Sequence, residues 1–183
     1  RNWHIFLNMR TRGILQSDFP AEIQNQVRRL YDEVIQEHTH HVVINMDCVP
    51  KNIFERKDGS IGLVDFELSS GVGDPAYDLG FLMGHYLIMS VIRKDKIVDA
   101  ITSMKQILKG YGNEMENLND ELFNKRLIKY AGVTMVYRIS GSSPASYIKP
   151  RTIPLIKMAG FDLIANDFKD FDVAFEFLKS KLS

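Results

Sequence analysis

The chain has 183 residues, 45% of them apolar and 25% charged, which is the composition of one globular domain with a sizeable core. Lysine plus arginine and aspartate plus glutamate both total 23, so the formal charge is zero and no overall field attracts nucleic acid or an acidic membrane. A single cysteine, Cys48, excludes an intrachain disulfide and predicts a reducing, cytoplasmic location. No apolar run reaches transmembrane length, and the opening residues do not resemble a signal peptide.

The first half of the chain predicts a helix followed by a short β segment. Apolar residues recur at helical spacing within 21–37, which predicts an amphipathic helix whose buried face holds Ile23, Val27, Leu30 and Val34. The β-branched stretch 41–46 predicts a strand. Residues 52–66 predict a β-hairpin, because apolar residues flank a KDGS turn.

The second half predicts helices only. Residues 76–92 are apolar nearly all round, which predicts a buried helix. Further helices are expected over 94–109, over 119–137 and, as a pair broken near Asn166, within 152–182. The expected fold class is therefore α+β: a single domain that is mostly helical, with a small hairpin. Its expected parts are a leading helical segment (1–40), a loop and hairpin (41–75) and a helical subdomain (76–183).

Three polar residues are expected to meet at one end of the hairpin. Asn52 precedes its first strand, Asp65 ends its second, and Asp47 lies on the loop that leads into it. The two ends of an antiparallel hairpin return to the same place, with neighbouring strands roughly 5 Å apart. Two carboxylates and one amide oxygen are hard donors, which suit Mg²⁺. One carboxylate then remains for general base catalysis.

The pattern Asp-x-x-Pro-x-Asn (47–52), followed by a hairpin and Asp-Phe-Glu (65–67), resembles the catalytic core of kinase-like phosphotransferases. Within that group it is most similar to the aminoglycoside phosphotransferase and choline kinase superfamily. The stretch GDPAYDLG (73–80) resembles the segment that follows the metal-binding Asp there. The stretch YRISGSSPASYI (137–148) is similar to an Arg-x-x-Gly-x-Ser-Pro segment of some members. The resemblance spans about 40–148 and implies the carboxy-terminal lobe of a kinase-like fold.

The resemblance assigns roles to single residues. It implies that Asp47 accepts the proton of the substrate hydroxyl and orients it toward the γ-phosphate of ATP. It implies that Asn52 and Asp65 bind Mg²⁺, with Asp65 holding the metal against the nucleotide phosphates. Asp78 is expected to support the loop by accepting backbone N–H bonds. Asp74, which stands before Pro75, is expected to cap a helix.

Two departures from the family pattern bear on function. The family has His-Gly directly before the catalytic Asp, and this chain has Asn45 and Met46. Protein kinases have a Lys two residues after that Asp, and here the position is Val49. The implied acceptor is therefore a small molecule: an aminoglycoside, a sugar or an amino alcohol. The alternatives are a kinase-like binding module with weak or no activity and, less favoured, a metal-dependent hydrolase.

The nucleotide-binding half of such an enzyme is not found in the sequence. No Gly-x-Gly-x-x-Gly occurs, Gly71 and Gly73 follow Asp65, and no β-sheet lobe is predicted before residue 41. We therefore expect a carboxy-terminal lobe that needs an amino-terminal nucleotide-binding lobe as its partner and is inactive alone. An apolar patch on the surface facing that lobe would favour a homodimer.

Several other residues have ordinary structural interpretations. Glu67 is expected to be solvated, Cys48 a small packed residue and His85 a satisfied core histidine. His38, His40 and His41 are expected at the surface, because adjacent strand residues point to opposite faces and cannot share a metal.

Two segments bear on the acceptor. Arg138 with 140–144 is either a helix end or a loop that reaches the cleft, and the sequence does not decide between them. The acidic residues Glu114, Glu116, Asp120 and Glu121 could attract a cationic acceptor, but such a run is usually a solvated helix start.

Overall fold

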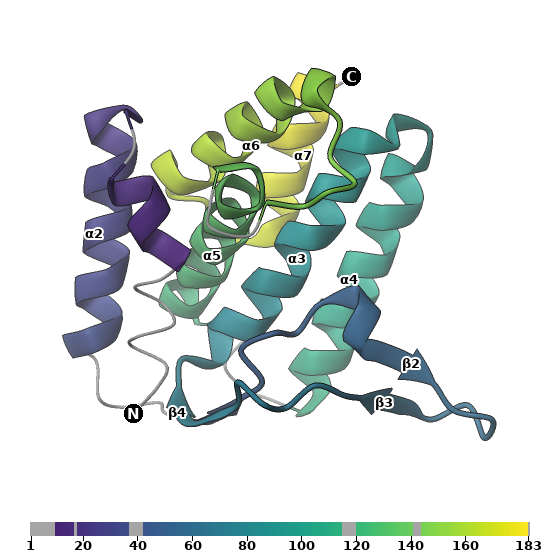
Figure 1. Cartoon of the computed structure of the whole chain (residues 1–183). Helices are drawn as coiled ribbons and strands as arrows, with labels where there is room; N and C mark the ends of the chain where they lie inside the picture. Colours follow the sequence, from purple (N-terminus) through teal and green to yellow (C-terminus); the bar gives the residue numbers. More distant parts are fainter. Residues whose placement is uncertain (1–9, 17, 37–41, 115–119, 141–143, 183) are drawn as a thin grey trace.

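The computed structural model describes residues 10–16, 18–36, 42–114, 120–140 and 144–182, with the backbone only at 70–72. The described helices are a short one at 10–15, α2 (Ala21–Gln36), α3 (Pro75–Ile92), α4 (Ile97–Glu114), α5 (Glu121–Ser140), α6 (Ile153–Ala165) and α7 (Phe171–Leu182). The described strands are β1 (Val42–Ile44), β2 (Ile53–Glu55), β3 (Ile61–Leu63) and β4 (Ser70–Gly73). Short 3₁₀ turns occur at η1 (Pro50–Asn52), η2 (Lys94–Lys96) and η4 (Pro150–Thr152). Figure 1 shows a helical body from which the β2–β3 hairpin projects.

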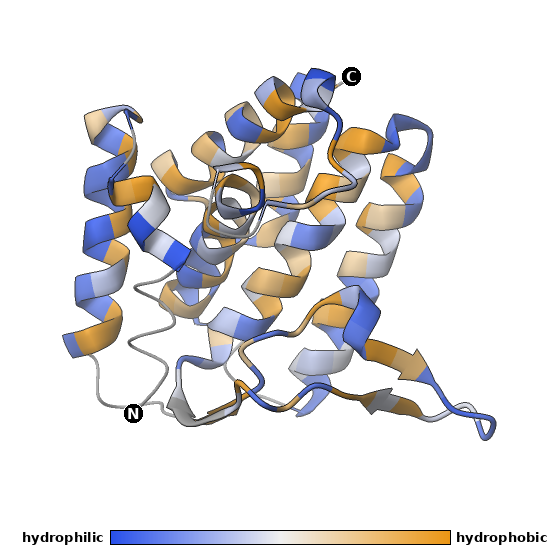
Figure 2. Cartoon of the chain, viewed as in Figure 1, coloured by the Kyte–Doolittle hydropathy of each residue, from blue (hydrophilic) through white to orange (hydrophobic). Residues whose placement is uncertain are grey.

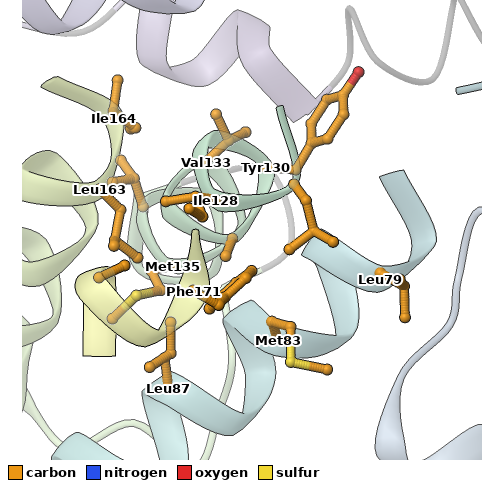
Figure 3. Packing of buried hydrophobic residues seen from close by; sticks show 14 of the residues in the cluster. Leu79, Met83, Leu87, Ile128, Tyr130, Val133, Met135, Leu163, Ile164 and Phe171 are labelled. Carbon is orange, nitrogen blue, oxygen red and sulfur yellow. The ribbon is translucent and has the colours of Figure 1, made fainter. Parts of the chain in front are cut away.

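The core lies where α3 and α5 pack together, with α6 and α7 behind them. Side chains of all four helices converge there, as Figure 3 shows for Leu79, Met83, Leu87, Ile128, Val133, Met135, Leu163 and Phe171. The α3–α5 contact is close at Gly84, where an added Cβ would lie 2.6 Å from Thr134 Cβ and 2.8 Å from the Ala131 carbonyl oxygen. This seam buries most of α3, as the sequence predicts for 76–92.

The β segment forms two small antiparallel pairs in the described chain. β1 pairs with β4 through Val42 opposite Gly73, with an irregularity before Ile44 opposite Ser70. β2 pairs with β3 in continuous register, so that Ile53 lies opposite Leu63. At the hairpin turn Gly59 has φ 80°, a left-handed conformation that suits glycine. The hairpin predicted from KDGS is thus confirmed.

Most predicted elements are confirmed. The amphipathic helix predicted over 21–37 is α2, and all four predicted core residues on it are buried. The tail forms two helices that separate after Ala165, next to the predicted break at Asn166. Strand β4 was not predicted, and the helix at 10–15 was expected only as part of a leading helical segment (1–40) without bounds of its own. None of the helices in the described part of the chain has both the length and the apolar character needed to cross a membrane.

Candidate active site

The Asp78 carboxylate, on the first turn of α3, holds the loop between β1 and η1. The Asp78 carboxylate accepts the backbone N–H of Asn45 at 2.6 Å and that of Met46 at 2.9 Å. Burial raises the pKa of Asp78, and these two bonds and the nearby Arg10 oppose the rise. The supporting role expected for Asp78 is confirmed.

Met46 turns the chain toward the hairpin in an uncommon conformation. Its φ is 67°, in the left-handed region, and its side chain is only 1% exposed within the core. A non-glycine residue in this region costs about 1–3 kcal/mol unless its surroundings hold it there. The buried Met46 side chain and the two bonds to Asp78 fix the loop despite that cost, and Asp47 follows directly.

Asp47 and Asn52 contact each other, as the sequence predicts. Asn52 Nδ2 donates to the Asp47 carbonyl oxygen at 3.0 Å and to its Oδ2 at 3.2 Å. The Asn52 side chain lies at the end of η1 and is buried. Asn45 Oδ1 accepts the backbone N–H of Asp47 at 3.1 Å, which further orients the Asp47 backbone.

Asp65 reaches the same end of the hairpin through its backbone. Val64 N donates to the Asn52 carbonyl oxygen at 3.0 Å, which carries the β2–β3 pairing one step further and places Asp65 beside η1. Asn45 Nδ2 lies 3.5 Å from the Asp65 carbonyl oxygen. Asp65 itself is exposed and has φ 65°. The structure therefore joins the side chains of Asp47 and Asn52 directly, and brings Asp65 to them through backbone contacts.

The donors at this end suit a cation that keeps several water or phosphate ligands. Among the described residues no group of three His, Cys, Asp or Glu side chains could hold a metal. The Asn52 amide nitrogen donates to Asp47, so its amide oxygen is the atom left for a cation, and the Asp65 side chain is exposed. Mg²⁺ is commonly bound through one or two carboxylates plus substrate phosphates, and Asn52 and Asp65 have oxygen atoms of the kind that it takes.

Arg10 is a site residue that the sequence did not reveal. It extends from the helix at 10–15, is 6% exposed, and places its guanidinium 3.9 Å from the centre of the Phe81 ring. Its Nη2 donates to the Met46 carbonyl oxygen at 3.3 Å and lies 3.4 Å from Asp47 Oδ1. Asp47 is thus held between Arg10 and Asn52. No local pattern could have shown this pair, because 37 residues separate its members.

A cavity of about 720 Å³ opens beside Asp47. Asp47 and Lys51 line it from the loop, α3 contributes His85, and α5 contributes Tyr137 and Arg138. Asn52 and Asp65 do not line it, so the cavity lies beside Asp47 but apart from the two expected metal ligands. The loop therefore separates the hairpin end, where the metal ligands are predicted, from the cavity, and the Asp47 carboxylate adjoins both.

His85 lines this cavity and is not the satisfied core histidine that the sequence predicts. It is 6% exposed and packs edge-on against Phe81, and its Nδ1 lies 3.5 Å from the Tyr147 hydroxyl. Its Nε2 is buried and has no hydrogen-bond partner among the described residues. Burial, with the nearby Arg138 and Arg10, lowers the pKa of His85 to about 4, so the imidazole is neutral at pH 7. The predicted burial of His85 is confirmed, whereas only one of its two ring nitrogens has a hydrogen-bond partner among the described residues.

Asp74 caps α3 as predicted, and it also accepts hydrogen bonds from two side chains of α5. Its Oδ1 accepts the backbone N–H of Ala76 at 3.0 Å. Its Oδ2 accepts Arg126 Nε at 2.9 Å and the Tyr130 hydroxyl at 3.1 Å. This buried network ties the start of α3 to α5, and it was not predicted because Arg126 and Tyr130 lie 52 and 56 residues from Asp74.

The remaining sequence interpretations have mixed outcomes. Burial, with Asp78 and Asp47 nearby, raises the pKa of Cys48 to about 12, which agrees with a packed and unreactive thiol. Glu67 is exposed, as expected. Met89 is 43% exposed, although the Met residues of 76–92 were expected in the core. His38, His40 and His41 lie outside the described residues.

The structure gives different outcomes for the two segments that could contact the acceptor. α5 ends at Ser140, and Arg138 near that end lines the cavity, so both interpretations of Arg138 hold in part; 141–143 lie outside the described residues. In the acidic cluster, Glu121 pairs with Lys125 at 2.7 Å and Asp120 accepts the Leu122 N–H at 2.9 Å, as expected of a helix start. Glu116 lies outside the described residues.

Comparison with known proteins gives no family assignment. No protein-family model matches this chain, and no curated protein matches its sequence. Function is therefore inferred from the geometry around Asp47 and from the resemblance of the motifs.

Proposed function

We propose that this chain is the carboxy-terminal, catalytic and acceptor-binding lobe of an ATP-dependent phosphotransferase that phosphorylates a hydroxyl of a small molecule. The observation that carries the proposal is the contact of Asp47 with Asn52, 3.2 Å between Oδ2 and Nδ2, at the hairpin end where Asp65 also lies. These are the three positions that the motif resemblance assigns to the catalytic Asp and to the metal ligands.

Asp47 is the group that would act on the acceptor. Its carboxylate borders the cavity and is positioned by Arg10 on one side and Asn52 on the other. The acceptor hydroxyl oxygen forms the new bond to the γ-phosphorus as the bond to ADP breaks, and its proton passes to the Asp47 carboxylate. Asn52 and Asp65 would hold Mg²⁺, which supplies charge neutralisation for the nucleotide phosphates.

The ribbon, which comprises the β2–β3 hairpin and the residues up to Phe66, has exposed apolar side chains that support a nucleotide-binding lobe as its partner. Ile61 is 64% exposed and Phe66 56%, and Leu63 and Val64 between them are also exposed. Figure 2 shows apolar stretches along the strands of this hairpin outside the helical body, with a hydrophilic turn at its tip. Apolar side chains gathered on a projecting element are typical of an interaction surface. A second lobe seated there would cover them and bring nucleotide to Asp65.

The proposal is tested by ADP formation. The full-length protein is assayed with Mg-ATP and a panel of alcohols, beside Asp47→Asn and the surface control Asp99→Asn. Loss of the proton acceptor lowers the rate at least 100-fold, since general base catalysis contributes about 10²- to 10⁴-fold. Asp99→Asn keeps the wild-type rate. Equal rates for wild type and Asp47→Asn would exclude the proposed role of Asp47.

One observation favours the alternative of a kinase-like binding module without turnover. Asn45 replaces the histidine of the family motif, and its bond to the Asp65 carbonyl is 3.5 Å, at the weak limit for a hydrogen bond. A poorly held Asp65 would lower catalysis and leave binding intact. The two functions are separated by measuring nucleotide binding and turnover on the same protein: binding with no turnover on any acceptor identifies the module.

A further inference from the structure

We propose that the acceptor is a hydroxylated molecule carrying an anionic oxygen group, which the cavity beside Asp47 binds. This inference rests on the proposed function, because it names the class of molecule that presents its hydroxyl to Asp47. It differs from the neutral or cationic acceptors that the motif resemblance suggests.

The position of the cavity points to the acceptor rather than to the nucleotide. Asp47 lines the cavity, but Asn52 and Asp65 do not. A molecule in the cavity therefore meets the expected proton acceptor without occupying the expected metal ligands. The volume of about 720 Å³ lies within the range of sites for small metabolites.

The charge of the cavity wall selects an anion. Among the described residues that line it, Arg10, Lys51 and Arg138 are cationic and Asp47 is anionic, so the wall has a formal charge of +2. Asp47 lies 3.4 Å from Arg10, and Lys51 and Arg138 carry the other two positive charges of the lining. A concave surface of one sign concentrates ligands of the opposite sign.

Neutral groups in the same wall suit the rest of such a molecule. His85 belongs to the cavity wall, and its Nε2 is buried without a hydrogen-bond partner among the described residues. Burial first, and then Arg138 and Arg10, lower the pKa of His85, while Asp47 opposes the shift, so the imidazole adds no positive charge to the wall at pH 7. Phe81, Tyr137 and Tyr147 add aromatic surface, and the acidic residues 120 and 121 are not part of the lining.

The charge preference is measured by binding, without nucleotide. Glucose, glucosamine, glucuronate and glucose 6-phosphate share one hydroxylated ring and differ in charge, so they serve as matched probes. The full-length protein carries ¹³C-methyl methionine, and Met89, which lines the cavity, reports binding by its methyl shift. Met104 is fully buried in α4, does not line the cavity, and is the reference.

We expect at least one of the two anionic probes to shift Met89 and to bind at least tenfold more tightly than glucose and glucosamine. The carboxylate and phosphate arms tell which anionic group the site takes. Arg138→Gln weakens anion binding at least tenfold, because a charge-assisted bond is lost. Arg151→Gln, an exposed change outside the cavity, has no effect. Equal or tighter binding of glucose or glucosamine overturns the inference, as does binding of none of the four or a Met89 shift caused by Mg-ATP.

The same probes distinguish this inference from the proposed function. ADP formation is measured with each probe in a second assay. Anion binding without ADP formation supports the anionic cavity and counts against phosphotransfer. ADP formation that prefers glucose or glucosamine supports phosphotransfer and overturns the anionic acceptor.

Discussion

At the residue scale, the site depends on Met46, which combines a left-handed φ of 67° with a buried side chain. The family motif has glycine at this position, and glycine adopts positive φ without steric cost. The chain instead places a core side chain there. Met46 thereby anchors the loop at Asp47 by packing, at the expense of backbone strain.

Met46→Ala and Met46→Gly separate the packing from the strain. Both lose the buried side chain, which costs about 2–5 kcal/mol. Met46→Gly also relieves the strained backbone, so we expect it to be more stable than Met46→Ala by about 1 kcal/mol, the reverse of their order in a helix or strand. Urea unfolding of the three proteins measures this, and a Met46→Ala protein more stable than Met46→Gly would show that the backbone is unstrained.

The titration of His85 gives a second prediction. Its pKa falls from 6.5 to about 4 on folding, so below pH 6.5 the unfolded chain binds the proton more tightly. The contribution of His85 to stability is therefore present above pH 6.5 and is lost as the pH falls toward 4. Relative to His85→Gln, the wild type should lose about 2 kcal/mol of unfolding free energy between pH 7.5 and pH 5. Other groups titrate in both proteins, so the difference isolates His85; a constant difference would contradict the lowered pKa.

At the scale of elements, local signals predicted most of the fold, and contacts between distant residues were not predicted. α2, the hairpin and the tail helices follow from periodicity and turn residues close in sequence. β4 has the sequence SGVG, which has little strand propensity. This strand forms because it pairs with β1. The meeting of Asp47 and Asn52 was predicted because Asp47 lies on the loop that leads into the hairpin, whereas no pattern indicated that Arg10 reaches them from the leading helical segment.

The α3–α5 seam predicts opposite outcomes for one substitution at two glycines. An added Cβ at Gly84 would lie within 2.9 Å of Thr134 and of the backbone of α5, so Gly84→Ala overpacks the core and should destabilise by about 1–3 kcal/mol. At Gly110, inside α4, nothing lies within 4 Å of an added Cβ. Gly110→Ala should therefore stabilise by about 0.5–1 kcal/mol through helix propensity. Thermal or urea unfolding measures the change in unfolding free energy for each variant. Two changes of the same sign would refute the close packing at Gly84.

At the scale of the whole molecule, a well-packed helical body carries a ribbon with apolar residues on its surface. The body holds the buried core, and Ile61 of the hairpin and Phe66, which follows Asp65, are exposed to solvent. A surface of this kind is usually covered by another protein surface. In the proposed enzyme that cover is the nucleotide-binding lobe, and in its absence a second copy can take its place.

The 183-residue chain should therefore associate with itself through the ribbon. Sedimentation velocity over a range of concentrations should show a monomer–dimer equilibrium, because burying the exposed side chains of both copies removes apolar area from water. Ile61→Lys with Phe66→Lys should shift the equilibrium to monomer. The control pair Val98→Lys and Leu122→Lys changes residues that are 64% and 55% exposed on α4 and α5, and should leave the dimer intact. A dimer that survives the ribbon changes, or dissociates with the control pair, places the contact elsewhere.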